Sequence, residues 1–138
     1  MEQTEQNKAL VMRFAHAQAE HQLDLLDDLM TPDFVRHCQA SPGAEETNLE
    51  QFKQFLDADR ASVPDARITP KFLVAEGDLV AVYGVYGGTQ RGAWGPLPPT
   101  NRYFEVDFTA WFRIASGKIA ELWVTWDNVT VLRQLGHQ

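Results

Sequence analysis

The stretch that decides the fold is FRIASGKIAELWVTWD, residues 112–127. Apolar side chains alternate with polar ones on both sides of a Ser-Gly pair, which is typical of two β-strands joined by a tight turn. A two-residue turn at Ser116 and Gly117 would place Phe112 opposite Glu121. The stretch therefore predicts a β-hairpin near the end of the chain.

The register of this hairpin decides which side chains share a face of the sheet, because directly opposed residues project to the same side. With the two-residue turn, the face that carries Glu121 and Asp127 is otherwise apolar, and we expect it to line the core. A three-residue turn would instead bring Arg113 opposite Glu121 and reverse the assignment. The predicted core face consists of Phe104, Val106, Phe108, Ala110, Phe112, Ile119, Glu121, Trp123, Thr125 and Asp127.

The opposite face of the hairpin mixes aromatic and charged residues. It carries Trp111 and Trp126 beside Asp107 and Arg113. Trp and Arg are enriched in protein interfaces and suit them better than a water-exposed surface. We therefore expect this face to form the interface of a homodimer.

Upstream of the hairpin, helical spacing of apolar residues comes first and two-residue alternation follows. Helices followed by an antiparallel meander make an α+β layout with the helices packed on one side of the sheet. The predicted elements are helices over 5–19, 23–30 and 47–63, an extended piece over 33–37, a loop over 39–46, strands over 66–77, 78–89, 102–114 and 118–129, and a last helix beginning around Val129.

The composition limits the class of protein. A chain of 138 residues suits one domain, residues 1–138, and a hydrophobic content of 44% allows a substantial core. The net charge of −7 disfavours nucleic acid and anionic membranes as partners. One cysteine, Cys38, excludes an internal disulfide, and no zinc-binding pattern is present. No segment resembles a signal peptide or a membrane helix, so we expect a cytoplasmic protein.

Two acids on an apolar face suggest chemistry. A carboxylate that loses hydration has a raised pKa, and a carboxyl group that titrates near neutral pH can exchange protons with a substrate. Glu121 and Asp127 are therefore candidate catalytic residues. Two structural alternatives stay open: Glu121 is held by Arg113 or a helix residue, and Asp127 caps the last helix near Val129.

Six segments in order carry a family pattern: NKALVMRF, DFVRH, VAEGDLVAV, GGTQRGAWGPLPPTNR, FRIASGKIAELWVTWD and LRQLG. Together they resemble the SnoaL-like polyketide cyclases, also called the ester cyclase family. This family belongs to the cone-shaped α+β barrel superfamily that includes ketosteroid isomerase and scytalone dehydratase. The resemblance implies a strongly curved antiparallel sheet wrapped around N-terminal helices, with a central cavity.

The resemblance also implies an activity. Known members close the last ring of an aromatic polyketide by an intramolecular aldol reaction, without a metal or an organic cofactor, on a small hydrophobic substrate. In the family pattern E-x-W-x-x-x-D, Asp127 would be the acid/base. Glu121 and Trp123 would line or orient the site, and His37, from the pattern F-x-x-H, would be a second polar group. Relatives also act as hydroxylases or isomerases, so the resemblance supports the fold more strongly than the reaction.

Aromatic side chains are the candidates for binding a hydrophobic substrate. Phe108 and Phe112 lie on the predicted core face, and Trp94 would either close the mouth of the cavity or plug the rim of the barrel. Tyr83 and Tyr86 have opposite parities on one strand, so only one of them can face the cavity.

The chain departs from the family at three positions. It has Gln90 where the family often has His, Asn101 where Gly is frequent, and Val124 where Asp often follows the motif tryptophan. The first change removes a titratable group and weakens the case for proton transfer from that loop.

Two other functions stay open. One is a non-catalytic small-molecule binding protein, which a cavity with both acids fully paired would favour. The other is epoxide hydrolysis, which needs an Arg bridging two acids. Arg102 and Arg113 are available, but the predicted register places Arg113 outside the cavity, so epoxide hydrolysis ranks last.

Overall fold

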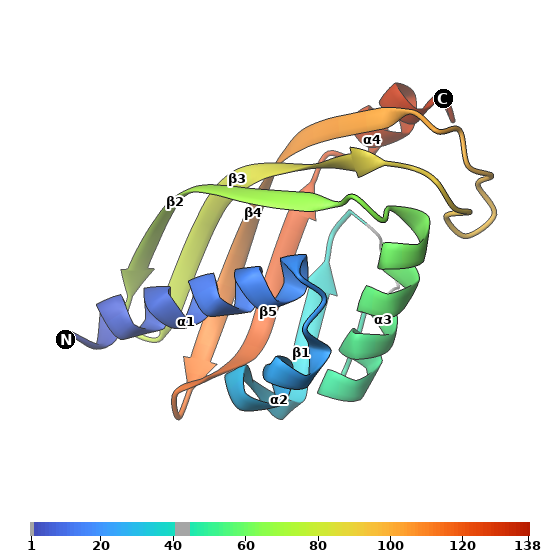
Figure 1. Ribbon diagram of the computed structural model, residues 1–138. Helices are drawn as coiled ribbons and strands as arrows, with labels where there is room; N and C mark the ends of the chain where they lie inside the picture. Colours follow the sequence, from blue (N-terminus) through green and yellow to red (C-terminus); the bar gives the residue numbers. More distant parts are fainter. Residues whose placement is uncertain (1, 41–44) are drawn as a thin grey trace.

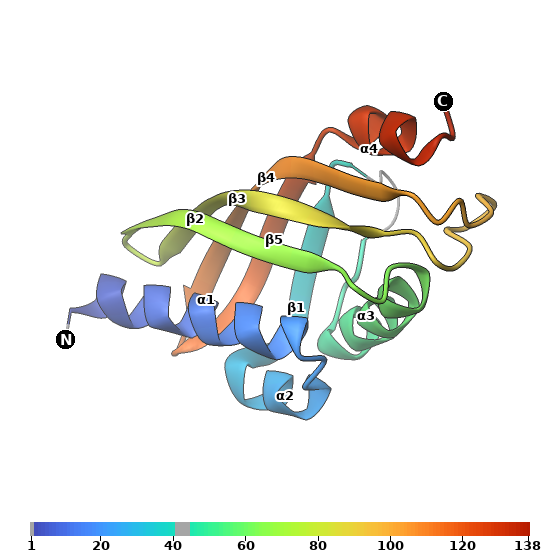
Figure 2. The same cartoon turned by 45° about the horizontal axis from the view of Figure 1, so that its top comes forward.

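The computed structural model describes residues 2–40 and 45–138, and residues 41–44 of the predicted loop lie outside the described residues. A strongly curved five-stranded sheet carries its helices on one side, with α1 lying across the sheet and α3 beside it (Figures 1 and 2). The α+β prediction is confirmed. The elements are α1 Gln3–Ala19, a 3-10 turn Leu23–Leu25, α2 Leu26–Leu29, β1 Met30–Cys38, α3 Leu49–Ser62, β2 Arg67–Glu76, β3 Leu79–Thr89, β4 Tyr103–Ala115, β5 Lys118–Trp126 and α4 Asn128–Leu135.

The strand order is β1-β5-β4-β3-β2, with antiparallel pairing from β2 to β5 as predicted for the meander. The extended piece expected over 33–37 is a full strand, β1, which pairs in parallel with β5. Pro32 lies in the part of β1 where the register shifts, between Met30 and Val35. An edge strand tolerates a proline there, because its missing N–H costs no central ladder bond.

The tight turn of the β4–β5 hairpin is confirmed. Ser116 and Gly117 both have positive φ, 51° and 77°, which is the geometry of a two-residue turn that matches the twist of the strands. Ala115 pairs with Lys118, as the two-residue turn requires.

The predicted faces of β5 are wrong from Glu121 onward, because a bulge follows the turn. Ile114 pairs with Ile119, but Arg113 pairs with Glu121, so Ala120 is an extra residue with no partner on β4. One inserted residue turns every later side chain to the other face. Glu121 therefore lies opposite Arg113, as the alternative turn predicted, although the turn itself has two residues.

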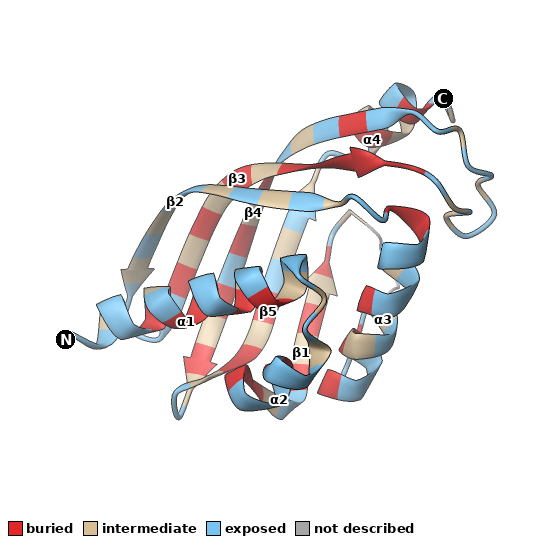
Figure 3. Ribbon diagram, viewed as in Figure 1, coloured by how far each residue is buried: buried red, intermediate tan, exposed pale blue. Residues whose placement is uncertain are grey.

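The core lies between the helices and the concave face of the sheet, where the buried segments face each other (Figure 3). Aromatic rings make its centre. Phe14 of α1 meets Phe112 edge-on at 5.5 Å between ring centroids, and Phe52 of α3 lies 5.0 Å from Phe34. Truncating such a ring to Ala typically costs about 3–5 kcal/mol, so these contacts fix α1 and α3 against the sheet.

Asn48 is the N-cap of α3. Asn48 accepts a hydrogen bond from the Gln51 backbone N–H at 2.8 Å, and the Gln51 side chain accepts one from the Thr47 N–H at 2.9 Å. This reciprocal pair satisfies two donors at the start of the helix. Among the described residues, no helix has both the length and the apolar character needed to cross a membrane.

Candidate functional site

A cavity lies between α1, α3 and the concave face of the sheet. The volume of this cavity is about 110 Å³. Its walls are mainly apolar, as expected for a site that binds a hydrophobic small molecule. The aromatic walls are formed by Phe14, Phe52, Phe108, Phe112, Trp94 and Trp126.

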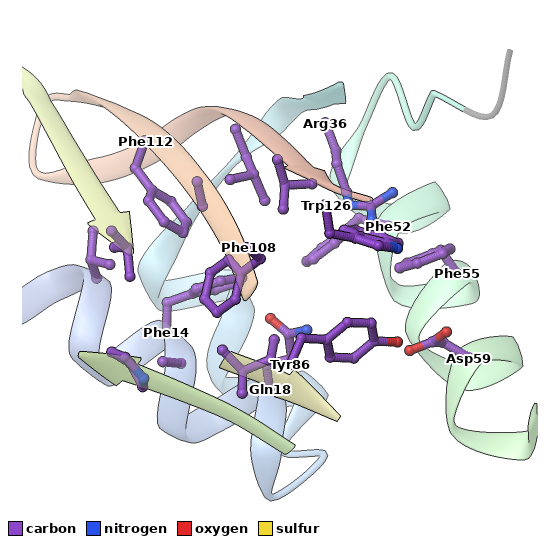
Figure 4. Close-up of a pocket in the computed structure, with 18 of the residues that line it drawn as sticks. Phe14, Gln18, Arg36, Phe52, Phe55, Asp59, Tyr86, Phe108, Phe112 and Trp126 are labelled. Carbon is purple, nitrogen blue, oxygen red and sulfur yellow. The ribbon is translucent and has the colours of Figure 1, made fainter. Parts of the chain in front are cut away.

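Four polar side chains reach this apolar cavity: Gln18 from α1, Arg36 from β1, Asp59 from α3 and Tyr86 from β3. The close-up in Figure 4 shows Tyr86 and Asp59 pointing toward one another, with Gln18 on the same side. A few convergent polar groups in an apolar hollow are typical of a ligand or active site.

Asp59 is the acid of this cavity. It follows Phe52, Phe55 and Leu56 at helical spacing, so it lies on the inner face of α3. Burial raises the pKa of Asp59 to about 6, while the positive charge of Arg36 works in the opposite direction. Among the described residues its carboxyl group has no hydrogen-bond partner. A carboxyl group in this state is free to bind a ligand and titrates close to neutral pH.

Tyr86 is the tyrosine that faces the cavity. Its ring meets Phe104 and Trp126 edge-on at 5.0 and 5.4 Å. Burial, followed by the charge of Asp59, raises the pKa of Tyr86 well above its usual value, so its hydroxyl keeps its proton and serves as a donor. Tyr83 lies on the outer face, where its hydroxyl donates to Asp107.

Arg36 is a buried cation at the cavity wall. Its side chain donates to Glu46 over 3.0 Å, and its guanidinium carbon lies 4.2 Å above the ring of Phe55. Burial raises the pKa of Glu46, although Arg36 opposes this rise. Among the described residues, the Arg36 side chain makes no other hydrogen bond, so most of its five N–H donors stay available to a ligand.

The predicted placement of Asp127 in the cavity is wrong. The side chain is exposed and caps α4, accepting hydrogen bonds from the backbone N–H groups of Val129 and Thr130 at 3.1 and 3.2 Å. The Thr130 hydroxyl donates to its second oxygen at 2.8 Å. The hydroxyl of Thr130 and then these N–H groups hold the pKa of Asp127 below its usual value. The structural alternative, a helix cap, is the observed arrangement.

The predicted placement of Glu121, Trp123 and His37 in the cavity is also wrong. The bulge at Ala120 directs Glu121 and Trp123 to the convex face, and His37 pairs with Trp123 and projects to the same face. All three lie on the convex face. Glu121 accepts from His37 Nε2 at 2.7 Å and from Arg113 Nε at 3.1 Å, while the His37 ring stacks on Trp123 at 5.4 Å. Glu45 lies 3.3 Å from the other ring nitrogen of His37.

The pKa shifts of His37 and Glu121 in this outer cluster favour an ion pair between them. The hydrogen bond with Glu121 is the largest cause that raises the pKa of His37, and partial burial opposes it. Partial burial acts to raise the pKa of Glu121, but the hydrogen bonds from His37 and Arg113 outweigh it and hold this pKa below its usual value. Glu121 is therefore a paired carboxylate.

Phe108, Phe112 and Trp94 line the cavity, as their prediction as substrate-binding residues requires. Trp94 packs near Phe104, with 6.0 Å between ring centroids, and its backbone pairs with Leu97 across the turn that follows it. Their contact with a substrate stays a prediction.

The structure also locates two of the residues that depart from the family pattern. Val124 now lines the cavity, at the position where the family often has Asp. Gln90 is fully buried and bonds to His137 Nε2 at 2.7 Å and to the backbone oxygens of Gly92 and Leu97, so it holds the loop and the chain end together.

Sequence reasoning missed Arg36, Asp59 and Tyr86 as a group. The inward orientation of two of them could be predicted. Arg36 lies two residues after the core residue Phe34 on β1, and Asp59 continues the apolar stripe of α3. Nothing in the linear pattern shows that these elements meet across one cavity, since that depends on the parallel pairing of β1 with β5.

Comparison with known proteins supports these features. The family model of the SnoaL-like polyketide cyclases matches residues 9–135. IdmH from Streptomyces antibioticus, provisionally named a polyketide cyclase, is 32% identical with a TM-score of 0.81, over 94% of this chain and 98% of that one. The comparison with curated proteins gave no match.

Two further solved structures share the fold at lower identity. A SnoaL-like protein from Jannaschia sp. CCS1 has a TM-score of 0.90 at 21% identity, over 100% of this chain and 97% of that one. AclR from Streptomyces galilaeus, provisionally named a hydroxylase, has a TM-score of 0.82 at 21% identity, over 98% of both chains. With a family match over nearly its whole length and a relative at 32% identity, the chain belongs to the SnoaL-like polyketide cyclase family.

Proposed function

We propose that this protein is a cofactor-independent cyclase or isomerase that acts by acid/base chemistry on a hydrophobic, polyketide-like carbonyl compound, with Asp59 as the acid/base. The observation that carries the proposal is a carboxyl group without a hydrogen-bond partner among the described residues, in an apolar cavity, whose pKa is raised to about 6. At pH 7 such a group is mainly ionised and can accept a proton, and it returns that proton readily.

The reaction proceeds in two proton transfers. The carboxylate of Asp59 takes a proton from the carbon next to a substrate carbonyl, and the electron pair of that C–H bond forms an enolate. In a cyclase the enolate carbon attacks a second carbonyl of the same molecule, and the new alkoxide takes the proton back from Asp59. In an isomerase the proton returns to another carbon of the conjugated system. Asp59 ends each cycle ionised.

Tyr86 and Arg36 supply the stabilisation that this chemistry needs. The Tyr86 hydroxyl lies on the same side of the cavity as Asp59 and keeps its proton, so it can donate to the enolate oxygen. Arg36 holds a buried positive charge at the same wall, with side-chain donors that have no partner in the part of the chain that the structure describes. Donors fixed in a site of low polarity stabilise a developing oxyanion more than water does, since they need no reorganisation.

Proton exchange on a simple ketone tests the proposal without knowledge of the natural substrate. The bicyclic ketone 2-tetralone exchanges the hydrogens next to its carbonyl for deuterium, which NMR follows in D2O. We expect Asp59→Asn to lower the enzyme-dependent exchange rate by at least about 100-fold. Asp57→Asn, an exposed neighbour on the same helix, serves as the matched control and keeps the rate.

The same assay separates the alternative function. A binding protein would hold 2-tetralone in the cavity without accelerating its exchange, in the wild type as in the variants. The full pairing of Glu121 and the capping role of Asp127 favour structural roles for those two acids. Exchange that Asp59→Asn leaves unchanged would refute the role proposed for Asp59.

We further propose that the convex face of the sheet is the interface of a homodimer. Large apolar side chains are exposed there on strands β4, β5 and β2: Trp111 is 50% exposed, Trp123 38% and Phe72 60%. Exposed patches of this kind mark interaction sites. We expect Trp111→Glu to convert a dimer to a monomer in light scattering after size-exclusion chromatography, while Val129→Glu on the exposed side of α4 does not. A wild-type monomer at 100 µM would contradict the proposal.

A further inference from the structure

A second, smaller hollow adjoins the cavity at the junction of α1, α3 and the start of β2. The volume of this hollow is about 50 Å³. A cavity needs only about 10–15 Å³ to hold a water molecule, so the hollow has room for water. Its outer edge carries the exposed residues Arg60 and Pro64, and its inner wall carries Ala66. We call it the side chamber.

The side chamber and the cavity share a polar wall. Gln18, Asp59 and Tyr86 line both of them. The carboxyl group of Asp59 therefore borders two separate hollows, one mainly apolar and one that has His21 and Arg60 at its edge. Asp59 has no hydrogen-bond partner among the described residues, so its oxygens are available on the chamber side as well.

We propose that the side chamber binds water and connects Asp59 to solvent while a ligand fills the main cavity. A hydrophobic ligand displaces water from the apolar cavity and would leave an ionised Asp59 without hydration. Water in the side chamber hydrates the carboxylate from the other side, and it carries the proton between Asp59 and bulk solvent. This inference deepens the proposed function and rests on Asp59 being its acid/base, but its test needs no turnover.

Two small residues allow each hollow to be filled separately. Ala110 lines only the main cavity, and Ala66 lines only the side chamber. Ala110→Phe imitates a bound ligand, and Ala66→Leu fills the chamber. The acid dissociation constant of Asp59 is measured by 13C NMR of proteins labelled at the Asp carboxyl carbon, and the Asp59 signal is assigned by its loss in Asp59→Asn. Ala58→Leu, at an exposed position on α3, is the control substitution.

The decisive comparison is that of the acid dissociation constant of Asp59 between double variants that share Ala110→Phe. There, adding Ala66→Leu should lower the acid dissociation constant of Asp59 at least tenfold, because the carboxylate loses its last source of water. Adding Ala58→Leu should change it less than twofold. A change below twofold with Ala66→Leu and also with a second variant that fills the chamber would overturn the inference.

A second variant guards against a folding defect. Ala19→Leu enters the side chamber from α1 instead of from the inner wall, and it should reproduce the tenfold effect. If neither variant lowers the constant in a protein with native near-ultraviolet circular dichroism, the chamber does not hydrate Asp59. The proposed function fails on a different result, the retention of 2-tetralone exchange by Asp59→Asn, so the two failures are distinguishable.

Discussion

The raised pKa of Asp59 makes a prediction about stability. The pKa rises from the usual 3.8 to about 6 in the folded protein because the cavity removes water from the carboxylate. A folded pKa above the unfolded one means that ionisation opposes folding. The cost is absent below about pH 3.8, grows between pH 3.8 and 6, and is complete above that range. Asp59→Asn removes a charge that the folded protein bears at a cost.

The magnitude follows from the pKa. The rise from 3.8 to about 6 corresponds to about 3 kcal/mol at neutral pH. An Asn does not titrate, so Asp59→Asn should become more stabilising as pH rises, by about 2 kcal/mol between pH 4.5 and pH 7.5. The same substitution should abolish proton exchange on 2-tetralone, since a stable variant without activity is expected where a site holds an unfavourable charge.

Urea unfolding followed by tryptophan fluorescence measures this difference at several pH values. Asp33→Asn is the control, because Asp33 is exposed on β1 and does not line the cavity. If the stability of Asp59→Asn runs parallel to that of the wild type from pH 4.5 to 7.5, the carboxylate is not desolvated. The reasoning about its role as an acid/base would then be refuted together with the pKa.

Three further substitutions separate the cavity from the rest of the molecule. Asp127→Ala should lower the melting temperature by roughly 2–6 °C through loss of the α4 cap, measured by circular dichroism, and leave 2-tetralone exchange unchanged. Tyr86→Phe should reduce exchange about 10-fold or more with little change in stability, since it removes one donor from the developing oxyanion. His37 has a raised pKa beside Glu121, so its contribution to stability is complete below pH 6.5 and is lost as pH rises through its folded value. The advantage of the wild type over His37→Gln in thermal unfolding should therefore be larger at pH 6 than at pH 8.

Much of the fold could be predicted from the sequence because the local spacing of apolar residues indicates most helices and strands. The apolar spacing of 5–19 and 47–63 and the alternation after residue 66 correspond to α1, α3 and the antiparallel strands. The Ser-Gly pair determines the turn, since both residues adopt positive φ. Parallel pairing of β1 with β5 could not be predicted in this way, because it joins segments that are more than 80 residues apart.

The candidate site was harder to predict because one residue decides it. Ala120 has no feature that marks it as a bulge, and yet it reverses the faces of Glu121, Trp123 and Val124. The prediction assigned Glu121 and Asp127 to the cavity on the assumption of unbroken alternation. The bulge sends Glu121 to Arg113 and His37, where its charge is paired, and leaves β5 with apolar side chains at the cavity.

The absence of an acid on the cavity face of β5 gives Asp59 its importance. Val124 lines the cavity where the family often has Asp, so the strand that could supply an acid has none there. Asp59 approaches the same cavity from α3, where Tyr86 and Arg36 are already present. The site that we propose keeps the requirements of the chemistry, one base and donors in an apolar hollow, and places the base on α3 instead of on the strand. Relatives that carry Asp on the strand should therefore need no acid at the position of Asp59, and introducing Val124→Asp into Asp59→Asn should restore part of the 2-tetralone exchange. A double variant as inactive as Asp59→Asn would show that position on the cavity wall alone does not make an acid catalytic.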